Sequence, residues 1–185
     1  MRSLQQEHGK DALGVYLGNP NVHNLGGTLL NGGFLRALKT RNKFSATSVD
    51  QLPHHMVAWK LFGHQLRIPV PDIDRSDYFV IMGGNPLASN GSIMSVADVR
   101  GRLKQVRQRG KVVVIDPRRS QTAELANEHH FIRPGSDVLL LLAMLNHLFA
   151  SAQVTSGHYR SLLDSDPMAL KPHFDAYTPE RVAEH

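Results

Sequence analysis

Apolar runs alternate with amphipathic stretches along the chain, and this alternation predicts strands and helices in turn. Residues 78–82 and 112–115 are short runs of β-branched and other apolar side chains, a pattern typical of buried strands. Between these runs, apolar side chains recur at helical spacing on Val96, Val99, Leu103 and Val106. We predict a helix here that begins at Ser95, has Asp98 as its capping-box partner and ends at Gly110.

Strand, helix and strand at this spacing form a βαβ unit, whose two strands are parallel and joined by a right-handed crossover. Further along the chain we predict a helix over residues 121–127, a strand over 131–133 and a buried helix over 136–150. Nearer the N-terminus, the same reasoning predicts strands over 12–17 and 43–47, and helices over 28–39 and 54–62, the second ended by Gly63. The expected fold is a three-layer α/β sandwich with a mainly parallel sheet.

The chain becomes more polar after residue 150, and prolines interrupt it at Pro167, Pro172 and Pro179. Thr178 and Pro179 are typical of the first residues of a helix, close to the last residue of the chain. We therefore expect residues 1–150 to form the α/β domain and residues 151–185 to form a helical tail that begins the next segment. The chain is expected to be a piece of a longer protein.

Composition removes several classes of function. The 185 residues include no cysteine, which excludes disulfides, a thiolate nucleophile and an iron–sulfur cluster bound by this chain alone. The longest apolar run, residues 138–145, is too short to span a membrane. The 11 histidines include two adjacent pairs but no His-x-x-x-His, so we do not expect a structural zinc site.

The net charge of +5 suggests a polyanionic partner. Basic residues gather over residues 100–111, but no aromatic side chain lies among them to stack on a base. We interpret them as the solvated face of a helix, and we expect no nucleic-acid partner.

Three segments should lie at the carboxyl edge of the parallel sheet, where ligands of such sheets bind. The first is Gly83-Gly84-Asn85-Pro86, continuing to Ser89, whose glycines let backbone N–H groups approach an anion. In the second, Asp116-Pro117-Arg118, the carboxylate suits a ribose diol and the guanidinium suits phosphate; alternatively, Asp116 caps a turn. In the third, Gly135-Ser136-Asp137, the carboxylate could accept from a guanine edge, although sequence physics alone favours helix capping by Ser136 and Asp137.

These segments, in this order and each after a predicted strand, resemble the molybdopterin-dinucleotide oxidoreductases, the class of formate dehydrogenases, nitrate reductases and dimethyl sulfoxide reductase. The resemblance is carried by residues 80–86, 114–118, 122–123 and 132–137, and it extends to residues 14–20 and 177–180. It implies two molybdopterin guanine dinucleotides around a molybdenum or tungsten ion, with a 4Fe-4S cluster that only the parent protein could bind. It also implies a small-molecule substrate and an electron carrier as partners.

The resemblance also implies roles for individual residues. Gly84 and Asn85 would line the pyrophosphate or nucleoside, Asp116 the ribose, Arg118 the phosphates and Asp137 the guanine. The remaining residues expected to line the cofactor are Gly83, Pro86, Ser89, Pro117 and Gly135.

The protein ligand of the metal would lie in residues 45–53. The resemblance implies Asp50 as the ligand, because it leads the Gln-Leu-Pro segment as the ligand does in similar members of that class; Ser48 is the alternative, and both could be ordinary loop residues. His54 follows this loop and is expected near the substrate as a catalytic residue.

The expected function is that of part of a molybdenum- or tungsten-dependent oxidoreductase, cytoplasmic, with the isolated chain inactive. The alternative is a stand-alone nucleotide- or phosphate-binding module without redox activity.

Overall fold

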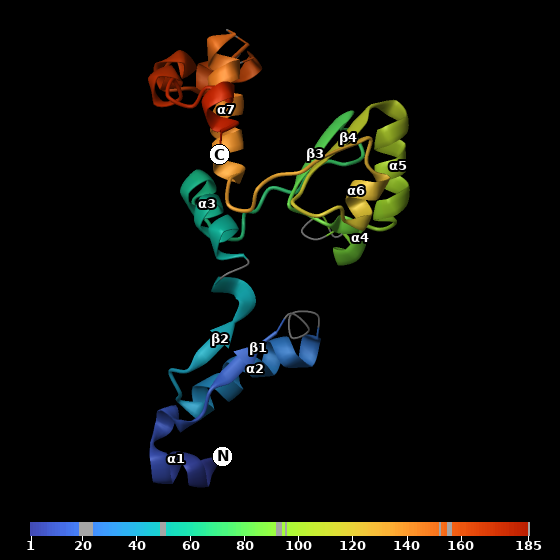
Figure 1. Cartoon of the computed structure of the whole chain (residues 1–185). Coiled ribbons are helices and arrows are strands. Elements are labelled where there is room, and N and C mark those ends of the chain that lie inside the picture. Colours follow the sequence, from blue (N-terminus) through green and yellow to red (C-terminus); the bar gives the residue numbers. More distant parts are fainter. Residues whose placement is uncertain are drawn as a thin grey trace. The chain divides into compact units, whose positions relative to one another are not determined.

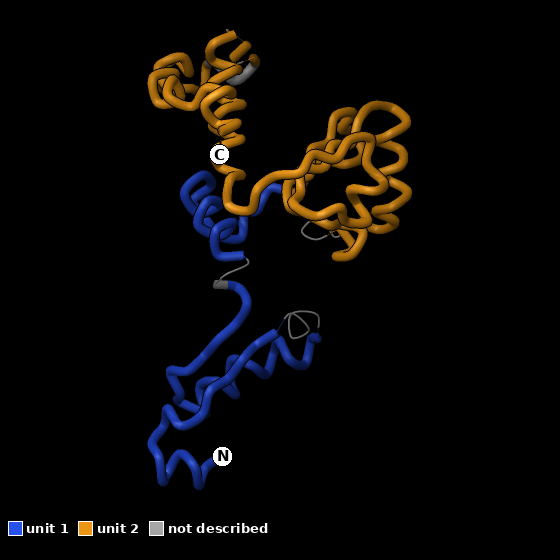
Figure 2. Tube along the Cα trace, viewed as in Figure 1, with its two compact units in different colours: residues 1–69 blue, residues 70–185 orange. Residues whose placement is uncertain are grey.

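The structure is a computed structural model that describes residues 1–18, 24–48, 51–91, 94, 96–151, 153–154 and 157–184. It divides into two compact units, residues 1–69 and residues 70–185 (Figure 2). Each unit contains a parallel sheet with helices, so the expected α/β class with parallel sheets is confirmed (Figure 1).

The first unit contains, in chain order, α1 (Arg2–His8), the 3-10 turn η1 (Lys10–Ala12), β1 (Val15–Leu17), α2 (Leu25–Leu38), β2 (Lys43–Ser45), η3 (Ala46–Ser48) and α3 (Leu52–Phe62). Strands β1 and β2 pair in parallel. Helix α2 begins three residues earlier than predicted because the Asn24 side chain caps it, accepting a hydrogen bond from the Gly27 N–H at 2.8 Å. Helix α3 ends at Gly63 as predicted, where the backbone has a φ of 73°.

A side-chain clamp ties the start of the first unit to the turn before β2. The Asp11 carboxylate accepts hydrogen bonds at 2.8 Å from both the backbone N–H and the Nε of Arg41. These bonds hold the pKa of Asp11 below its ordinary value. The buried Thr40 hydroxyl adds a hydrogen bond to the Leu13 carbonyl at 2.7 Å. Long-range polar contacts of this kind organise a unit that has few buried apolar side chains.

The second unit contains β3 (Tyr78–Met82), α4 (Pro86–Ser89), α5 (Val99–Arg109), β4 (Lys111–Ile115), α6 (Gln121–Leu125), β5 (Glu128–His130), α7 (Asp137–Ala150), η5 (Gly157–Leu162), η6 (Pro167–His173) and α8 (Pro179–Val182). Its sheet has the order β3-β4-β5, with both pairs parallel. The predicted βαβ unit is therefore confirmed. Thr178 caps α8 as predicted, because its hydroxyl accepts a hydrogen bond from the Arg181 N–H at 3.3 Å.

The main hydrophobic core of the second unit lies between its sheet and helices α5 and α6, which lie on the same face of the sheet (Figure 1). Leu103 and Val106 of α5 and Val112 and Val114 of β4 are fully buried. Burying four such side chains contributes roughly 1.5–3 kcal/mol each. Strands β3 and β4 are therefore held in place by packing against the buried faces of α5 and α6.

Helix α5 begins at Val99, so the prediction that this helix begins at Ser95 is wrong. Residues 96–98 precede the helix, and Ser95 itself lies outside the described residues. Asp98 is the N-cap rather than a capping-box partner, and its Oδ1 accepts a hydrogen bond from the Gly101 N–H at 3.0 Å. The helix therefore starts directly after Asp98, whose side chain caps a free N–H group of the first turn.

The third strand of this sheet is Glu128–His130, so the predicted strand over residues 131–133 is wrong. Asn127 explains the difference. Its backbone N–H donates to the Val112 carbonyl at 2.9 Å, and its Oδ1 accepts from the Val112 N–H at 2.8 Å. Asn127 thus ends the α6 segment two residues early and starts strand pairing before Phe131.

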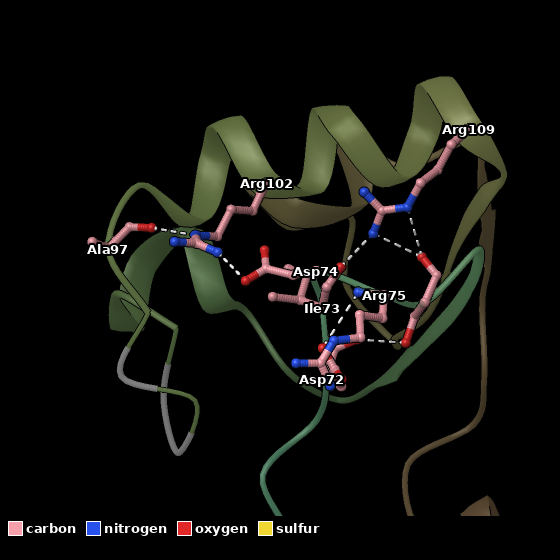
Figure 3. Close-up of polar contacts among 8 residues, drawn as sticks. Asp72, Ile73, Asp74, Arg75, Ala97, Arg102 and Arg109 are labelled. Carbon is pink, nitrogen blue, oxygen red and sulfur yellow. Dashed lines mark hydrogen bonds and ion pairs between the residues drawn. The ribbon is translucent and has the colours of Figure 1, made fainter.

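Two arginines of α5, Arg102 and Arg109, hold the segment that leads into β3, so these two cations do more than form a solvated helix face (Figure 3). Arg109 donates to the carbonyls of Ile73 and Ser76, and Arg102 pairs with Asp74. Arg100, Lys104 and Arg107 of α5 are exposed and make no hydrogen bond or ion pair from their side chains to a described residue.

Within the described part of the chain, no helix is long and apolar enough to cross a membrane.

Candidate functional site

The ends of β3, β4 and β5 lie side by side through backbone hydrogen bonds that continue the sheet. The Gly83 N–H donates to the Ile115 carbonyl at 2.9 Å, and the Asp116 N–H donates to the His130 carbonyl at 3.1 Å. Residues 83–86 and residues 116–118 therefore share one edge, as the sequence predicts. We call this place the strand-end edge.

The loop over residues 83–86 presents backbone donors at this edge. Gly83 has a φ of 63°, the left-handed region that favours glycine, and it turns the chain away from β3. A Cβ on Gly84 would lie 3.1 Å from Ile81 Cγ2, so the loop packs closely on the sheet. The N–H groups of Gly84 and Asn85 make no hydrogen bond to any described residue. Successive free N–H groups beside a left-handed residue are a typical anion-binding arrangement.

The Asn85 side chain points away from this role, toward α6. Its Oδ1 accepts a hydrogen bond from the Thr122 hydroxyl at 2.7 Å, and its Nδ2 donates to Gln121 Oε1 at 2.7 Å. Neither Thr122 nor Gln121 was predicted to contact the loop. The signal available was weak, since residues 122–123 entered only as part of the family resemblance.

Asp116 follows β4 and is buried, with 8% of its surface exposed. Its Oδ1 accepts a hydrogen bond from the Arg118 N–H at 2.7 Å, so the turn-capping interpretation is confirmed. Its Oδ2 accepts no hydrogen bond from the described residues, which leaves one acceptor for a ligand hydroxyl. The Arg118 side chain is exposed and forms no ion pair within the described residues, while Pro117 is exposed between the two.

Two further residues expected to line the cofactor, Pro86 and Ser89, belong to α4. Pro86 is buried and begins the helix. The Ser89 hydroxyl is 3.3 Å from the Asn85 carbonyl, to which it donates. In the structure both residues hold the loop in place, Pro86 by its burial and Ser89 by its hydrogen bond.

The third segment, Gly135-Ser136-Asp137, lies at the start of α7. Gly135 has a φ of 87°, and the Ser136 hydroxyl donates to the Arg133 carbonyl at 2.7 Å. Asp137 is half-buried in the first turn of α7, where a carboxylate favours the helix dipole. Among the described residues, no hydrogen bond or ion pair joins Gly135 or Asp137 to the strand-end edge. The guanine contact of Asp137 stays a prediction.

The expected metal ligand Asp50 lies outside the described residues, and its alternative Ser48 is the last residue of η3. Within the described residues, no three histidine or acidic side chains converge as a metal site. His54 is exposed on α3, whereas His55 lines a pocket of about 300 Å³ in the first unit. The other lining residues of this pocket are Leu52, Met56, Trp59, Gly63, His64 and Gln65.

Known proteins similar to this chain point to one family. Nitrate reductase from Klebsiella oxytoca is 27% identical over 166 residues, which cover 84% of this chain and 18% of that protein. The formate dehydrogenase major subunit of Haemophilus influenzae is 30% identical over 83 residues, covering 45% of this chain and 8% of that protein. Both carry names of the class that the motifs resemble.

The fold has a match among solved structures. Acetylene hydratase from Pelobacter acetylenicus superposes with a TM-score of 0.67 and 23% sequence identity, covering 99% of this chain and 24% of that chain. This likeness supports the α/β fold. The chain spans 16% and 18% of the length of two nitrate reductases that it matches.

The sequence model of the family described as molybdopterin oxidoreductase matches residues 1–158, which is most of the chain and includes the whole strand-end edge. Together with the named relatives, this match shows that the chain belongs to the molybdopterin oxidoreductase family.

Proposed function

We propose that this chain binds the guanine dinucleotide part of a molybdopterin cofactor at the strand-end edge, as part of a molybdenum or tungsten oxidoreductase. The observation that carries the proposal is that the N–H groups of Gly84 and Asn85, and the Oδ2 of Asp116 on the same sheet edge, have no hydrogen-bond partner among the described residues. An anion fits the first feature, and a ribose hydroxyl fits the second.

The charges and donors of the residues present suit a nucleoside diphosphate. The exposed guanidinium of Arg118 adds a cation that can pair with a phosphate. Glycine at position 84 keeps the loop close to the sheet, where a Cβ would press against Ile81. Backbone donors, a cation and a carboxylate acceptor thus supply what the phosphates and the ribose require.

GDP titration of the purified chain, followed by amide NMR, tests the nucleotide proposal. We expect shifts at Gly84 and Asn85, and weaker binding in Asp116→Asn and Arg118→Ala. Removing one charge-assisted contact should cost about tenfold or more in affinity. Arg107→Ala is the matched control, because Arg107 is an exposed arginine of α5 whose side chain makes no hydrogen bond or ion pair to a described residue. Equal affinity in Arg118→Ala and Arg107→Ala would contradict the assigned phosphate contact.

We propose Asp50 as the protein ligand of the metal, with Ser48 as the alternative. When bound, molybdenum or tungsten supplies two-electron redox chemistry at the substrate. A carboxylate is a suitable oxygen ligand, and in the sequence Asp50 stands two positions before the first residue of α3. In a full-length enzyme that carries this segment, Asp50→Ala should reduce metal content and turnover. Unchanged metal content and turnover would refute the assignment.

The second candidate function is a nucleotide-binding module without redox activity. It is favoured by the strand-end edge itself, because every residue placed there could bind a nucleotide diphosphate without a metal. Expression in a host that makes molybdopterin, followed by elemental analysis and pterin fluorescence of the purified chain, separates the two. Pterin that co-purifies supports the cofactor proposal, and bound GDP without pterin supports the module.

A further inference from the structure

We propose that Thr122 is a positioning residue for the strand-end edge, and that the Asn85 amide is a structural clamp rather than a contact to the ligand. The inference deepens the proposed function and rests on it for the identity of the ligand. The juxtaposition that carries it is the pairing of the loop after β3 with the first turn of α6 by side-chain hydrogen bonds.

The Thr122 hydroxyl is fully used within the protein. It donates to Asn85 Oδ1 at 2.7 Å and accepts from the Leu87 N–H at 3.2 Å. The residue has 0% of its surface exposed, so water does not replace these bonds when they are lost. One buried hydroxyl therefore ties both ends of the Asn85–Leu87 turn to α6.

The side-chain atoms and the carbonyl of Asn85 all have hydrogen-bond partners within the protein. Its Oδ1 and Nδ2 are bonded to Thr122 and Gln121, and its carbonyl accepts from the N–H groups of Ala88 and Ser89 at 2.9 and 3.0 Å. The backbone N–H is the polar group of Asn85 that makes no hydrogen bond to a described residue. A ligand at this edge is thus met by backbone donors of the loop.

Asn85 also departs from what its position in the chain favours. It is the N-cap of α4, where an asparagine side chain ordinarily accepts a hydrogen bond from its own helix. Here no such bond forms, and the side chain turns to residues 36 and 37 positions away. The local interaction is given up for a long-range one, which holds the direction of the Gly84 and Asn85 N–H groups.

A double-mutant cycle on the full chain, with GDP as the probe, tests the inference. Thr122→Val removes the hydroxyl and nearly keeps the shape, and we expect about tenfold weaker GDP binding by the folded protein. Thr122→Ser keeps the hydroxyl and should bind within about twofold of the original chain. Asn85→Ala should weaken binding about as much as Thr122→Val, and the double variant should be no weaker than either.

Other outcomes overturn the inference. A direct contact from the Asn85 amide would make Asn85→Ala the far weaker binder, with losses that add in the double variant. A purely structural Thr122 would lower the thermal midpoint of Thr122→Val and leave its GDP affinity unchanged. Where Thr122→Val does not fold, Gln121→Ala replaces it, because Gln121 is exposed and its loss leaves the core intact.

A measurement without ligand separates this inference from the proposed function. Absence of GDP binding by the original chain counts against the nucleotide proposal. The clamp is then tested by hydrogen exchange of the Asn85 side-chain amide and by the amide shifts of Gly84 and Asn85. We expect protection in the original chain and in Thr122→Ser, and loss of protection with shifted amides in Thr122→Val. Unchanged exchange and shifts in Thr122→Val overturn the positioning role.

Discussion

Arg109 of α5 fastens the segment that enters β3, and its removal should destabilise the second unit (Figure 3). The guanidinium donates to the Ile73 carbonyl at 2.6 Å and to the Ser76 carbonyl at 2.9 and 3.1 Å, and it lies 3.3 Å from Asp77 Oδ1. Ile73 is 3% exposed and belongs to the main core. The perturbation is Arg109→Ala, which leaves these carbonyls without their donor.

The magnitude follows from burial. Hydrogen bonds to a charged group contribute about 1.5–3 kcal/mol each when buried, whereas exposed ion pairs contribute about 0–1 kcal/mol. The Arg109 side chain is 30% exposed and Asp77 is 76% exposed, so the bond to Ile73 dominates and the ion pair adds little. We expect a loss of about 1–2 kcal/mol, without a helix-propensity penalty because alanine is the best helix former.

Urea unfolding followed by far-UV circular dichroism measures this loss. The single tryptophan, Trp59, belongs to the first unit, so its fluorescence reports on the wrong part of the chain. With a slope of about 2 kcal/mol per molar urea, a loss of about 1–2 kcal/mol should lower the midpoint by roughly 0.5–1 M. Arg107→Ala, on the exposed side of the same helix, should change stability by less than about 0.5 kcal/mol. An Arg109→Ala midpoint equal to that of Arg107→Ala would refute the reasoning.

Two further changes have predictable outcomes. Gly110→Ala places a Cβ 1.8 Å from the Asp77 carbonyl oxygen and should cost about 1–3 kcal/mol in urea unfolding, whereas Gly33→Ala meets no atom within 4 Å and should not destabilise. A hydrogen bond from Lys111, followed by one from His130, holds the pKa of Glu128 below its ordinary value of about 4.3. Because a lowered folded-state pKa stabilises above the unfolded value, the stability difference between Glu128→Gln and the original chain should be constant at pH 8–9. It should vanish as the pH falls below about 4, and a difference that persists there contradicts the assignment.

Strand β3 was predicted with its observed bounds because residues 78–82 form an unbroken apolar run, although Tyr78 and Val80 are exposed in the structure. Strand β5 was missed because its residues are Glu128, His129 and His130, which no hydrophobic pattern marks. Two of its polar side chains, those of Glu128 and His129, bond to groups outside the strand. Lys111 bonds to Glu128 at 2.5 Å, and His129 Nε2 lies 3.0 Å from the Asp116 carbonyl. Residues 128–130 form a strand because they pair with β4, and such pairing with a distant segment cannot be seen in the local sequence.

The candidate site was predictable in its location but not in its internal contacts. Strand ends and turn residues placed Gly83, Gly84 and Asp116 on one edge, as the structure shows. The direction of the Asn85 amide depends on Thr122, 37 residues further along the chain. No spacing rule reaches that far. The sequence therefore identified the residues of the edge, but not the division between side chains that hold the loop and backbone N–H groups that are left for a ligand.

That division has a physical reason. A ligand that carries several negative charges is best met by donors that are already in place, since ordering them at binding costs conformational entropy. The loop achieves this with side chains facing inward, Asn85 on α6 and Pro86 in the core, and with backbone N–H groups facing outward. Glycine at positions 83 and 84 is then required twice, for the left-handed turn and for close packing on Ile81. The motif is thus a rigid support for two backbone donors, and its side chains contribute to binding by holding that support in place.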